Sequence, residues 1–227
     1  MSNPVTYSLE EGVATLTLDD GKANALSLDT IAAINSALDR AEQEAKALLI
    51  TGKAGVLSAG FDLRVIESDP AGAKEMATRG GELLVRIFMF PMPVVMASTG
   101  HAVGAGALLL LTADYRLGGD ADCKIVLNEA AMGFPLPGFG VELARARLVN
   151  TAIAQTVLCS QVHNTASASE VGFIDEVVAE DKLLAAAFDK AKALSQMEGK
   201  NYAAIKHSFR TPVAEKIAAY GAVNLEG

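Results

Sequence analysis

The chain has 227 residues, of which 51% are hydrophobic and 20% charged, and its formal net charge is −8 at pH 7. This composition is typical of a globular protein with a sizeable core. The acidic balance argues against nucleic acid as the main partner, because binding to phosphates requires clustered Lys and Arg side chains.

Neither the cysteines nor the N-terminus indicates export or a membrane. Cys123 and Cys159 have no disulfide or metal-ligand spacing, so we expect reduced thiols in a cytoplasmic protein and no metal site. Residues 1–4 lack the basic and apolar segments of a signal peptide. Residues 87–113 carry no Lys, Arg, Asp or Glu, but prolines and glycines interrupt them, so we predict buried strands and helices there and no membrane partner.

The chain begins with a predicted β-hairpin, because residues 6–9 and 13–19 alternate apolar and polar side chains around a turn at Glu11-Gly12. Ser27 is a good N-cap for a helix that reaches about residue 45. A short apolar strand over 47–51 then leads into a loop over 52–60.

The remaining elements follow the same alternation of strands and helices. Helices are predicted from about residue 62, over 73–90, over 107–113, and around 183–194 and 212–220; strands are predicted over 94–98, 114–117 and 174–178. Strands that alternate with helices in the first half indicate an α/β core. The helix-rich C-terminal part is a candidate for oligomer contacts.

Two segments share one design, in which a strand is followed by a glycine-containing loop and then by the start of a helix. In the first, Gly60 allows a sharp turn and Asp62 can cap the next helix. In the second, small residues around Ala105 allow a ligand oxygen to approach the backbone. Two such loops can direct two backbone N–H groups at one developing oxyanion. Loss of one such donor costs about 2.7–4 kcal/mol of transition-state stabilisation in a well-studied enzyme.

Four motifs, in order and with matching spacing, resemble the signatures of the enoyl-CoA hydratase/isomerase (crotonase) family: Asn24-Ala25-Leu26-Ser27, Ser58-Ala59-Gly60-Phe61-Asp62-Leu63, Gly100-His101-Ala102-Val103-Gly104-Ala105-Gly106 and Ala113-Asp114-Tyr115-Arg116. The resemblance covers roughly residues 5–180. It implies a crotonase (ClpP-like) spiral of ββα units over 1–180 and a helical oligomerisation region over 181–227. It also implies a homotrimer or a dimer of trimers.

The same resemblance assigns roles in the binding of an acyl-CoA thioester. The N–H groups of Ala59 and Ala105 are expected to form the oxyanion hole for the thioester carbonyl. The residues expected to border the substrate are Lys22, Ala23, Ala25, Ser58, Gly60, Phe61, Asp62 and Gly104. No cofactor is expected beyond the coenzyme A that is part of the substrate.

The acid and base residues favour one reaction of this family. A hydratase (a lyase) uses two carboxylates, and the position of the first is occupied here by Leu108, whereas Glu129 stands at the second. The segment 127–133 resembles the Δ3,Δ2-enoyl-CoA isomerase branch, in which one glutamate moves the proton. A partly buried glutamate beside an acyl channel also gains a raised pKa that suits a proton shuttle. We therefore expect an isomerase of fatty acid metabolism with Glu129 as its base.

Three alternatives remain beside this reading. The chain is a hydratase if Glu67, Glu75 or Glu82 supplies a second carboxylate, or a non-catalytic acyl-CoA-binding protein if the missing carboxylate marks a loss of catalysis. The pair Ser98 and His101 is a weak indication of a hydrolase. It is weak because no Asp is evident that would orient the histidine. A dinucleotide loop is rejected, since Leu109 stands where the third glycine of G-x-G-x-x-G belongs.

Overall fold

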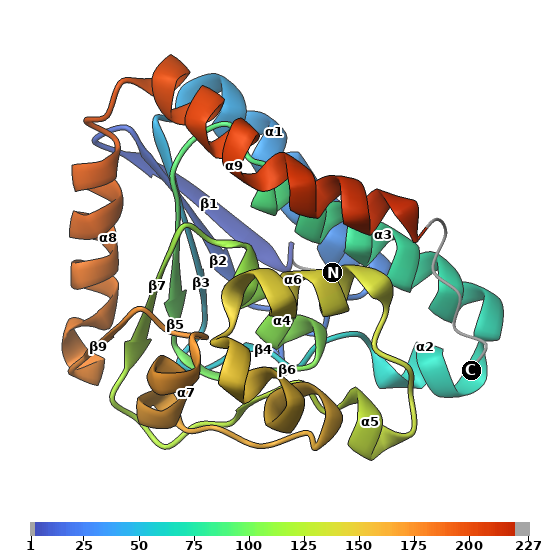
Figure 1. Cartoon of the computed structure of the whole chain (residues 1–227). Coiled ribbons are helices and arrows are strands. Elements are labelled where there is room, and N and C mark those ends of the chain that lie inside the picture. Colours follow the sequence, from blue (N-terminus) through green and yellow to red (C-terminus); the bar gives the residue numbers. More distant parts are fainter. Residues whose placement is uncertain (1–2, 221–227) are drawn as a thin grey trace.

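The computed structural model describes residues 3–220 (Figure 1); residues 1–2 of the N-terminal segment and residues 221–227 of the predicted C-terminal region lie outside the described residues. The strands form a six-stranded sheet in the order β1-β2-β3-β5-β7-β9 and a three-stranded sheet in the order β4-β6-β8. Only β1 and β2 pair antiparallel; all the other neighbours are parallel.

The core is built from three successive ββα units, each of which adds one strand to each sheet. The first consists of β3 (Ala47–Gly52), β4 (Gly55–Ser58), α2 (Leu63–Ser68) and α3 (Pro70–Phe88); the second of β5 (Val94–Ser98), β6 (Gly100–Val103) and α4 (Ala105–Thr112); the third of β7 (Tyr115–Gly119), β8 (Ile125–Val126), α5 (Glu129–Met132) and α6 (Gly138–Arg147). This arrangement confirms the predicted α/β spiral of ββα units.

The N-terminal hairpin and first helix start the layers. The hairpin consists of β1 (Val5–Glu10) and β2 (Val13–Leu18), and it is followed by α1 (Leu28–Glu44), whose first turn is capped by the side chain of Ser27 as predicted. The chain ends with α7 (Thr165–Val171), β9 (Glu176–Val178), α8 (Leu183–Leu194) and α9 (Gly199–Ala219).

Helices cover both faces of the six-stranded sheet. On one face α8 packs against β3, β5 and β7, and the cluster between them includes Leu49, Val95, Leu117 and Leu183 (Figure 1). On the other face lies the main core, to which α1, α3 and α4 contribute. Every residue of β3 and β5 is buried, which explains why their sequences are apolar without alternation.

Several predicted boundaries were wrong for local reasons. Helix α3 begins at Pro70, three residues before the prediction, because Pro is suited to the first helical position and Asp69 caps the helix by accepting the N–H of Gly72. Helix α4 begins at Ala105 and not at residue 107. Asp114 precedes β7, and its carboxylate accepts the N–H of Val94.

Strands β4 and β6 of the smaller sheet were missed, because they are only four residues long and lie in glycine-containing segments. At the C-terminal end, β9 covers 176–178 instead of 174–178. The helical stretch predicted over 212–220 is the last part of the single helix α9, which contains Pro212 in its interior.

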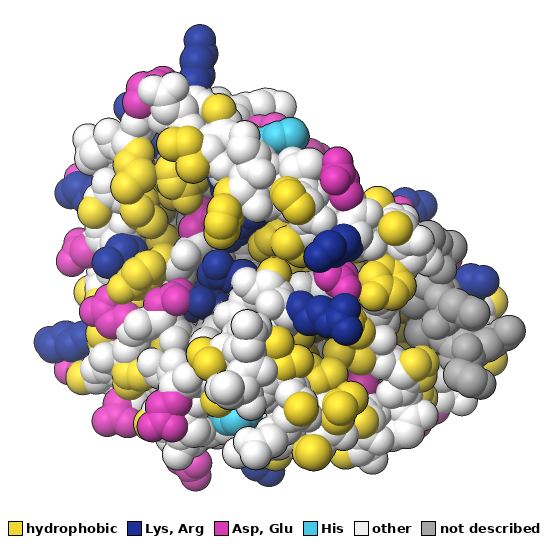
Figure 2. Space-filling view, viewed as in Figure 1, with side chains coloured by type: hydrophobic (Ala, Val, Ile, Leu, Met, Phe, Trp, Pro, Cys, Tyr) yellow, Lys and Arg dark blue, Asp and Glu magenta, His cyan; other side chains and the backbone are white. Residues whose placement is uncertain are grey.

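The surface over the C-terminal helices mixes apolar and charged side chains (Figure 2). The large apolar side chains exposed on and between α8 and α9 are Leu184, Met197, Ile205 and Phe209. In the described part of the chain, no helix is long and apolar enough to cross a membrane. The predicted division at residue 180 and the predicted trimer stay predictions.

Candidate active site

The site lies where the three parallel strands of the smaller sheet end. Ser58 of β4 is level with Ala102 of β6, and Ala102 is level with Ile125 of β8. The loops that follow these strands therefore leave the sheet at one edge, where binding sites of parallel sheets are commonly found. This register brings together residues 59–61, residues 104–105 and Glu129, which are spread over 70 positions of the sequence.

The first loop requires a correction of the predicted oxyanion donor. The N–H of Ala59 donates to the carbonyl of Ala23 over 2.9 Å, so it is already occupied. The hydroxyl of Ser58 is buried and donates to the carbonyl of Asn24, which makes Ser58 a support of the loop and not a ligand of the substrate. The N–H of Phe61, two residues beyond Ala59, donates to no group in residues 3–220.

In the second loop, the N–H group that was predicted as a donor is that of Ala105. The N–H of Ala105, at the start of α4, likewise has no acceptor within the described residues. Gly60 has φ +85°, and a Cβ there would lie 3.2 Å from the nitrogen of Ala105 and 2.6 Å from the carbonyl oxygen of Val103. Glycine is thus required both for the turn and for the close approach of the two loops. Phe61 and Ala105 both line the same cavity.

Glu129 stands at the first position of α5 and lies against the second loop. A Cβ added to Gly104 would be 3.3 Å from its Oε1 atom. Its other oxygen, Oε2, is buried and has no hydrogen-bond partner in the structure. Burial raises the pKa of the Glu129 carboxyl above its ordinary value, because a charged carboxylate is poorly solvated there. An unpartnered oxygen that faces a cavity is suited to accept a proton from a bound molecule.

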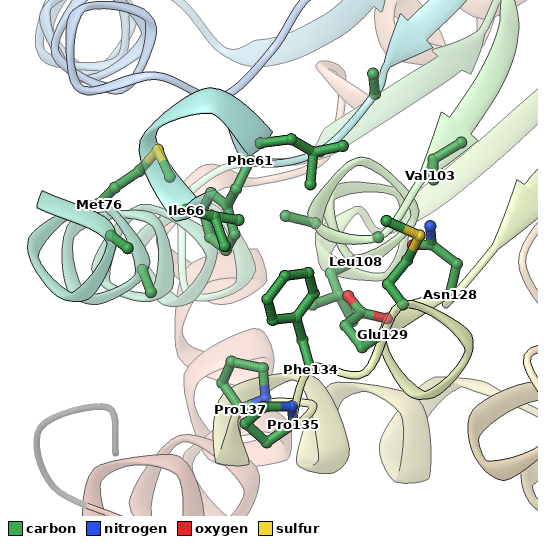
Figure 3. A pocket seen from close by; sticks show the side chains of 18 of the residues that line it. Phe61, Ile66, Met76, Val103, Leu108, Asn128, Glu129, Phe134, Pro135 and Pro137 are labelled. Atoms are coloured by element: carbon green, nitrogen blue, oxygen red, sulfur yellow. The ribbon is translucent and has the colours of Figure 1, made fainter. Parts of the chain in front are cut away.

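The cavity has a volume of about 390 Å³ and is lined mainly by apolar side chains. Phe61, Ile66 and Met76 come from the loop after β4, from α2 and from α3, and Phe134 and Pro137 face them from the segment after α5 (Figure 3). The ring of Phe134 and the carboxylate of Glu129 point into the space between these two walls (Figure 3). Of these wall residues the sequence had identified Phe61 alone, although Ala73 and Ala77 on one side of α3 form an apolar stripe one turn apart.

Among the described residues that line this cavity, Glu129 is the one acidic residue. Leu108 is only 1% exposed and forms part of the cavity wall. It occupies the position at which a hydratase would carry its first carboxylate. The three glutamates considered as substitutes do not line the cavity; Glu82 lines a separate groove between α3, α6 and α9. The described residues thus supply one carboxylate to the site.

Three further predicted substrate residues, Lys22, Ala23 and Ala25, are not among the residues that line the cavity. Lys22 and Ala23 are exposed and Ala25 is half-buried, in a turn organised by the carboxylate of Asp20, which accepts the N–H groups of residues 22, 24 and 25. A hydrogen bond from the N–H of Leu26 to the carbonyl of Gly60 connects this turn to the loop after β4.

Asp62 has a structural role of its own. Its carboxylate accepts the N–H of Arg64 and caps α2, as predicted. Hydrogen bonds from the Arg64 guanidinium lower the pKa of the Asp62 carboxyl.

The structure does not support a hydrolase based on Ser98 and His101. The hydroxyl of Ser98 is buried and donates to the carbonyl of Gly100. His101 is exposed, and its Nδ1 atom accepts the N–H of Lys124. Neither side chain is directed at the other. No group of His, Cys, Asp and Glu residues within residues 3–220 is arranged to hold a metal ion.

Comparisons with known proteins show the family to which the chain belongs. The family model described as Enoyl-CoA hydratase/isomerase matches residues 8–226. A protein of Bacillus subtilis (strain 168) described as a probable enoyl-CoA hydratase is 31% identical over 198 residues, which are 85% of this chain and 75% of that protein.

Solved structures with the same fold carry both names of the family. The structure of an enoyl-CoA hydratase/isomerase family protein from Pseudomonas syringae has a TM-score of 0.94 and 38% identity, over 96% of this chain and 95% of that chain. The apo structure of an enoyl-CoA isomerase from Mycobacterium tuberculosis has a TM-score of 0.92 and 35% identity, over 97% of this chain and 96% of that chain. Since the names divide between hydratase and isomerase, the choice between the two reactions rests on the residues of the site.

Proposed function

Because the chain belongs to the enoyl-CoA hydratase/isomerase family, we propose that it converts a 3-enoyl-CoA into the 2-enoyl-CoA, with Glu129 as the group that carries the proton. One observation carries this proposal. The cavity combines two backbone N–H groups that have no acceptor among the described residues, those of Phe61 and Ala105, with a single carboxylate.

Each of these groups has a role in the proposed reaction. The thioester oxygen accepts hydrogen bonds from the N–H groups of Phe61 and Ala105. The carboxylate of Glu129 removes a proton from C2, and the electron pair of that C–H bond moves toward the carbonyl to give a dienolate. The dienolate then forms a double bond between C2 and C3, while C4 takes the proton back from Glu129. No proton or electron is gained or lost overall.

Hydration demands more from the site than isomerisation does. Adding water across a double bond uses one group that activates the water and one that handles the proton at C2. Leu108 cannot do either, and the described lining of the cavity offers no second carboxylate. The runner-up is nevertheless a hydratase, since the similar Bacillus subtilis protein is described as one. The two reactions differ in product, because only hydration yields a 3-hydroxyacyl-CoA.

The test is the variant Glu129→Gln, assayed with a 3-enoyl-CoA and separately for C2 exchange of a saturated acyl-CoA in D₂O. We expect both rates to fall about 10²–10⁴-fold, since that is the usual contribution of a general base. Binding of the acyl-CoA should persist. Glu75→Gln is the matched control, because Glu75 is an exposed glutamate of α3 outside the cavity.

Retention of isomerase activity in Glu129→Gln would contradict the proposal. Formation of 3-hydroxyacyl-CoA by the wild type from crotonyl-CoA would favour the hydratase. Tight acyl-CoA binding without C2 exchange in the wild type would favour a non-catalytic binding protein.

A further inference from the structure

The helix that carries Glu129 is too short to hold itself in place. Helix α5 has four residues, and its N-cap residue, Asn128, makes no side-chain capping bond. The first N–H groups of any helix lack partners within the helix and need an outside acceptor. The position of such a short helix depends on its neighbours. The position of the Glu129 carboxylate therefore depends on them as well.

The outside acceptor comes from a loop about 30 residues further along the chain. The N–H of Ala131, in the first turn of α5, donates to the hydroxyl oxygen of Ser160 over 3.2 Å. The loop follows a π-helical turn over Ala154–Leu158, and it lies beside α5 at the lower edge of the molecule (Figure 1). π-helical turns are rare and occur often at functional sites.

Ser160 adopts a backbone conformation that serine rarely takes. Its φ is +48°, and Glu11 and Asn24 are the two other non-glycine residues within the described range with positive φ. This left-handed conformation costs free energy and persists only where the surroundings impose it. A glycine would adopt it more easily but would have no oxygen to offer Ala131.

The same loop is fixed at a second point, on the other side of Glu129. His163 and Ile125 exchange backbone hydrogen bonds in both directions, over 2.8 and 3.0 Å. His163 is itself buried, with its ring next to Phe173 and its Nε2 atom 3.2 Å from the hydroxyl oxygen of Thr156. The segment from Ile125 to Ala131 is therefore held at both of its ends, and Glu129 lies between the two contacts.

We propose that Ser160 is a positioning residue for Glu129, whose side chain it holds against the oxyanion loop by capping α5 from outside. This inference rests on the proposed function, because it assumes that the carboxylate of Glu129 meets the substrate. Ser160 itself does not line the cavity. Its contribution is to the placement of the base and not to the chemistry.

The test is Ser160→Gly, which allows the same backbone conformation and removes the side chain with its hydroxyl group. We expect kcat for the 3-enoyl-CoA to fall about tenfold with KM almost unchanged, because small displacements of a catalytic group slow the reaction strongly. The melting temperature should stay the same or rise, since glycine relieves the positive φ. A slower but equally stable enzyme separates positioning from a merely structural role. Exchange of the Ala131 amide hydrogen should also become faster.

Two further variants sharpen the result. Ser160→Asn should recover part of kcat, because asparagine tolerates positive φ and carries an acceptor oxygen. Glu11→Gly relieves the same φ in the β1–β2 turn, away from the site, at the loss of an ion pair with Lys192; its kinetics should match the wild type.

The outcomes for the two proposals can be told apart. An active wild type whose activity disappears in Glu129→Gln supports the proposed function whatever Ser160→Gly does. If Ser160→Gly then retains the wild-type kcat, the positioning role is wrong. It is equally wrong if kcat and the melting temperature fall together and Ser160→Asn restores neither.

Discussion

At the scale of single residues, the carboxyl group of Glu129 combines a functional position with an unfavourable environment. Its Oε2 atom is buried without a partner, and burial raises its pKa. The charged form, which is the proposed base, is therefore the form that the fold disfavours. Catalytic groups often carry such a cost, because the surroundings that tune a pKa also destabilise the folded state.

This cost predicts how Glu129→Gln changes stability with pH. Between the ordinary pKa of 4.5 and the raised one, the folded chain binds more protons than the unfolded chain, so the free energy of unfolding falls as pH rises. Glutamine is neutral at every pH and escapes this loss. We expect the variant to be more stable than the wild type by about 1 kcal/mol or more at pH 8, the usual cost of an unpaired buried group.

Urea unfolding of both proteins from pH 4 to pH 8 measures this difference. It should be smallest near pH 4 and grow until the pH exceeds the raised pKa. Glu75→Gln, on an exposed face, should show no such growth. A constant difference between wild type and Glu129→Gln would show that the carboxylate is not destabilised by burial.

The sequence predicted the type of site better than its individual atoms. The predictions for Glu129, Ala105 and the missing carboxylate at Leu108 came from the resemblance of the motifs to the family. The prediction that the N–H of Ala59 is a free donor was wrong, because that N–H is paired with the carbonyl of Ala23, 36 positions earlier. A hydrogen bond between distant backbone groups leaves no mark in local residue types.

At the scale of elements, long amphipathic helices and buried strands were predictable, and short elements were not. Residues 28–44, 94–98 and 183–194 carry apolar patterns that are long enough to identify. Strand β8 has two residues and α5 has four, so neither can show a period. These short elements exist because neighbouring strands and loops pair with them, as His163 does with Ile125.

Helix α9 contacts the C-terminal ends of α3 and α4, and Arg210 makes these contacts. Its guanidinium donates to the carbonyl of Phe88, at the end of α3, and to the carbonyls of Thr112 and Ala113, at the end of α4. It also pairs with Asp114 over 2.8 Å. A cation at the C-terminal end of a helix is favoured by the helix dipole as well as by these bonds.

We therefore expect Arg210→Met to lower the free energy of unfolding by about 3 kcal/mol, because buried carbonyls and part of a buried ion pair lose their partner. Denaturant unfolding at pH 7 measures this loss. Arg79→Met is the control, since Arg79 forms an exposed pair with Glu82, and it should change stability by about 0.5 kcal/mol or less. Equal effects of the two substitutions would contradict the role of Arg210.

At the scale of the whole molecule, charge is distributed unevenly between surface and interior. The chain has a net charge of −8, yet the buried contact between α9 and the core contains more cations than carboxylates. The buried or largely buried groups there are Arg116, Arg147, Lys206, Arg210 and Asp114; Arg116 also pairs with Asp175, which is exposed. Asp114 and Lys206 are separated by 92 positions, so no local pattern could reveal this cluster.

Because of this cluster, we expect the free energy of unfolding to change with pH in the alkaline range. Lys206 is 5% exposed; its Nζ atom donates to Asp114 over 2.8 Å and to the carbonyl of Met92, and it lies 5.9 Å from the ring of Tyr202. Burial, together with the nearby charges of Arg210 and Arg147, outweighs the attraction of Asp114 and lowers the pKa of Lys206 to about 8. The protonated form that prevails at neutral pH is thus less stable in the fold than in the unfolded chain.

Between pH 8 and the ordinary value of 10.5, the unfolded chain binds more protons at this lysine than the folded chain does. Stability contributed by Lys206 must therefore rise with pH across this window, by about 1.4 kcal/mol per pH unit at most. Lys206→Met removes this contribution while preserving the length of the side chain. From pH 7.5 to pH 10.5, we expect the free energy of unfolding of the wild type to increase by up to about 3 kcal/mol relative to that of the variant. Urea unfolding at intervals of half a pH unit measures the two curves, and groups that titrate alike in both proteins cancel. Parallel curves would mean that Lys206 keeps its ordinary pKa, and that Asp114 alone compensates the buried charge of α9.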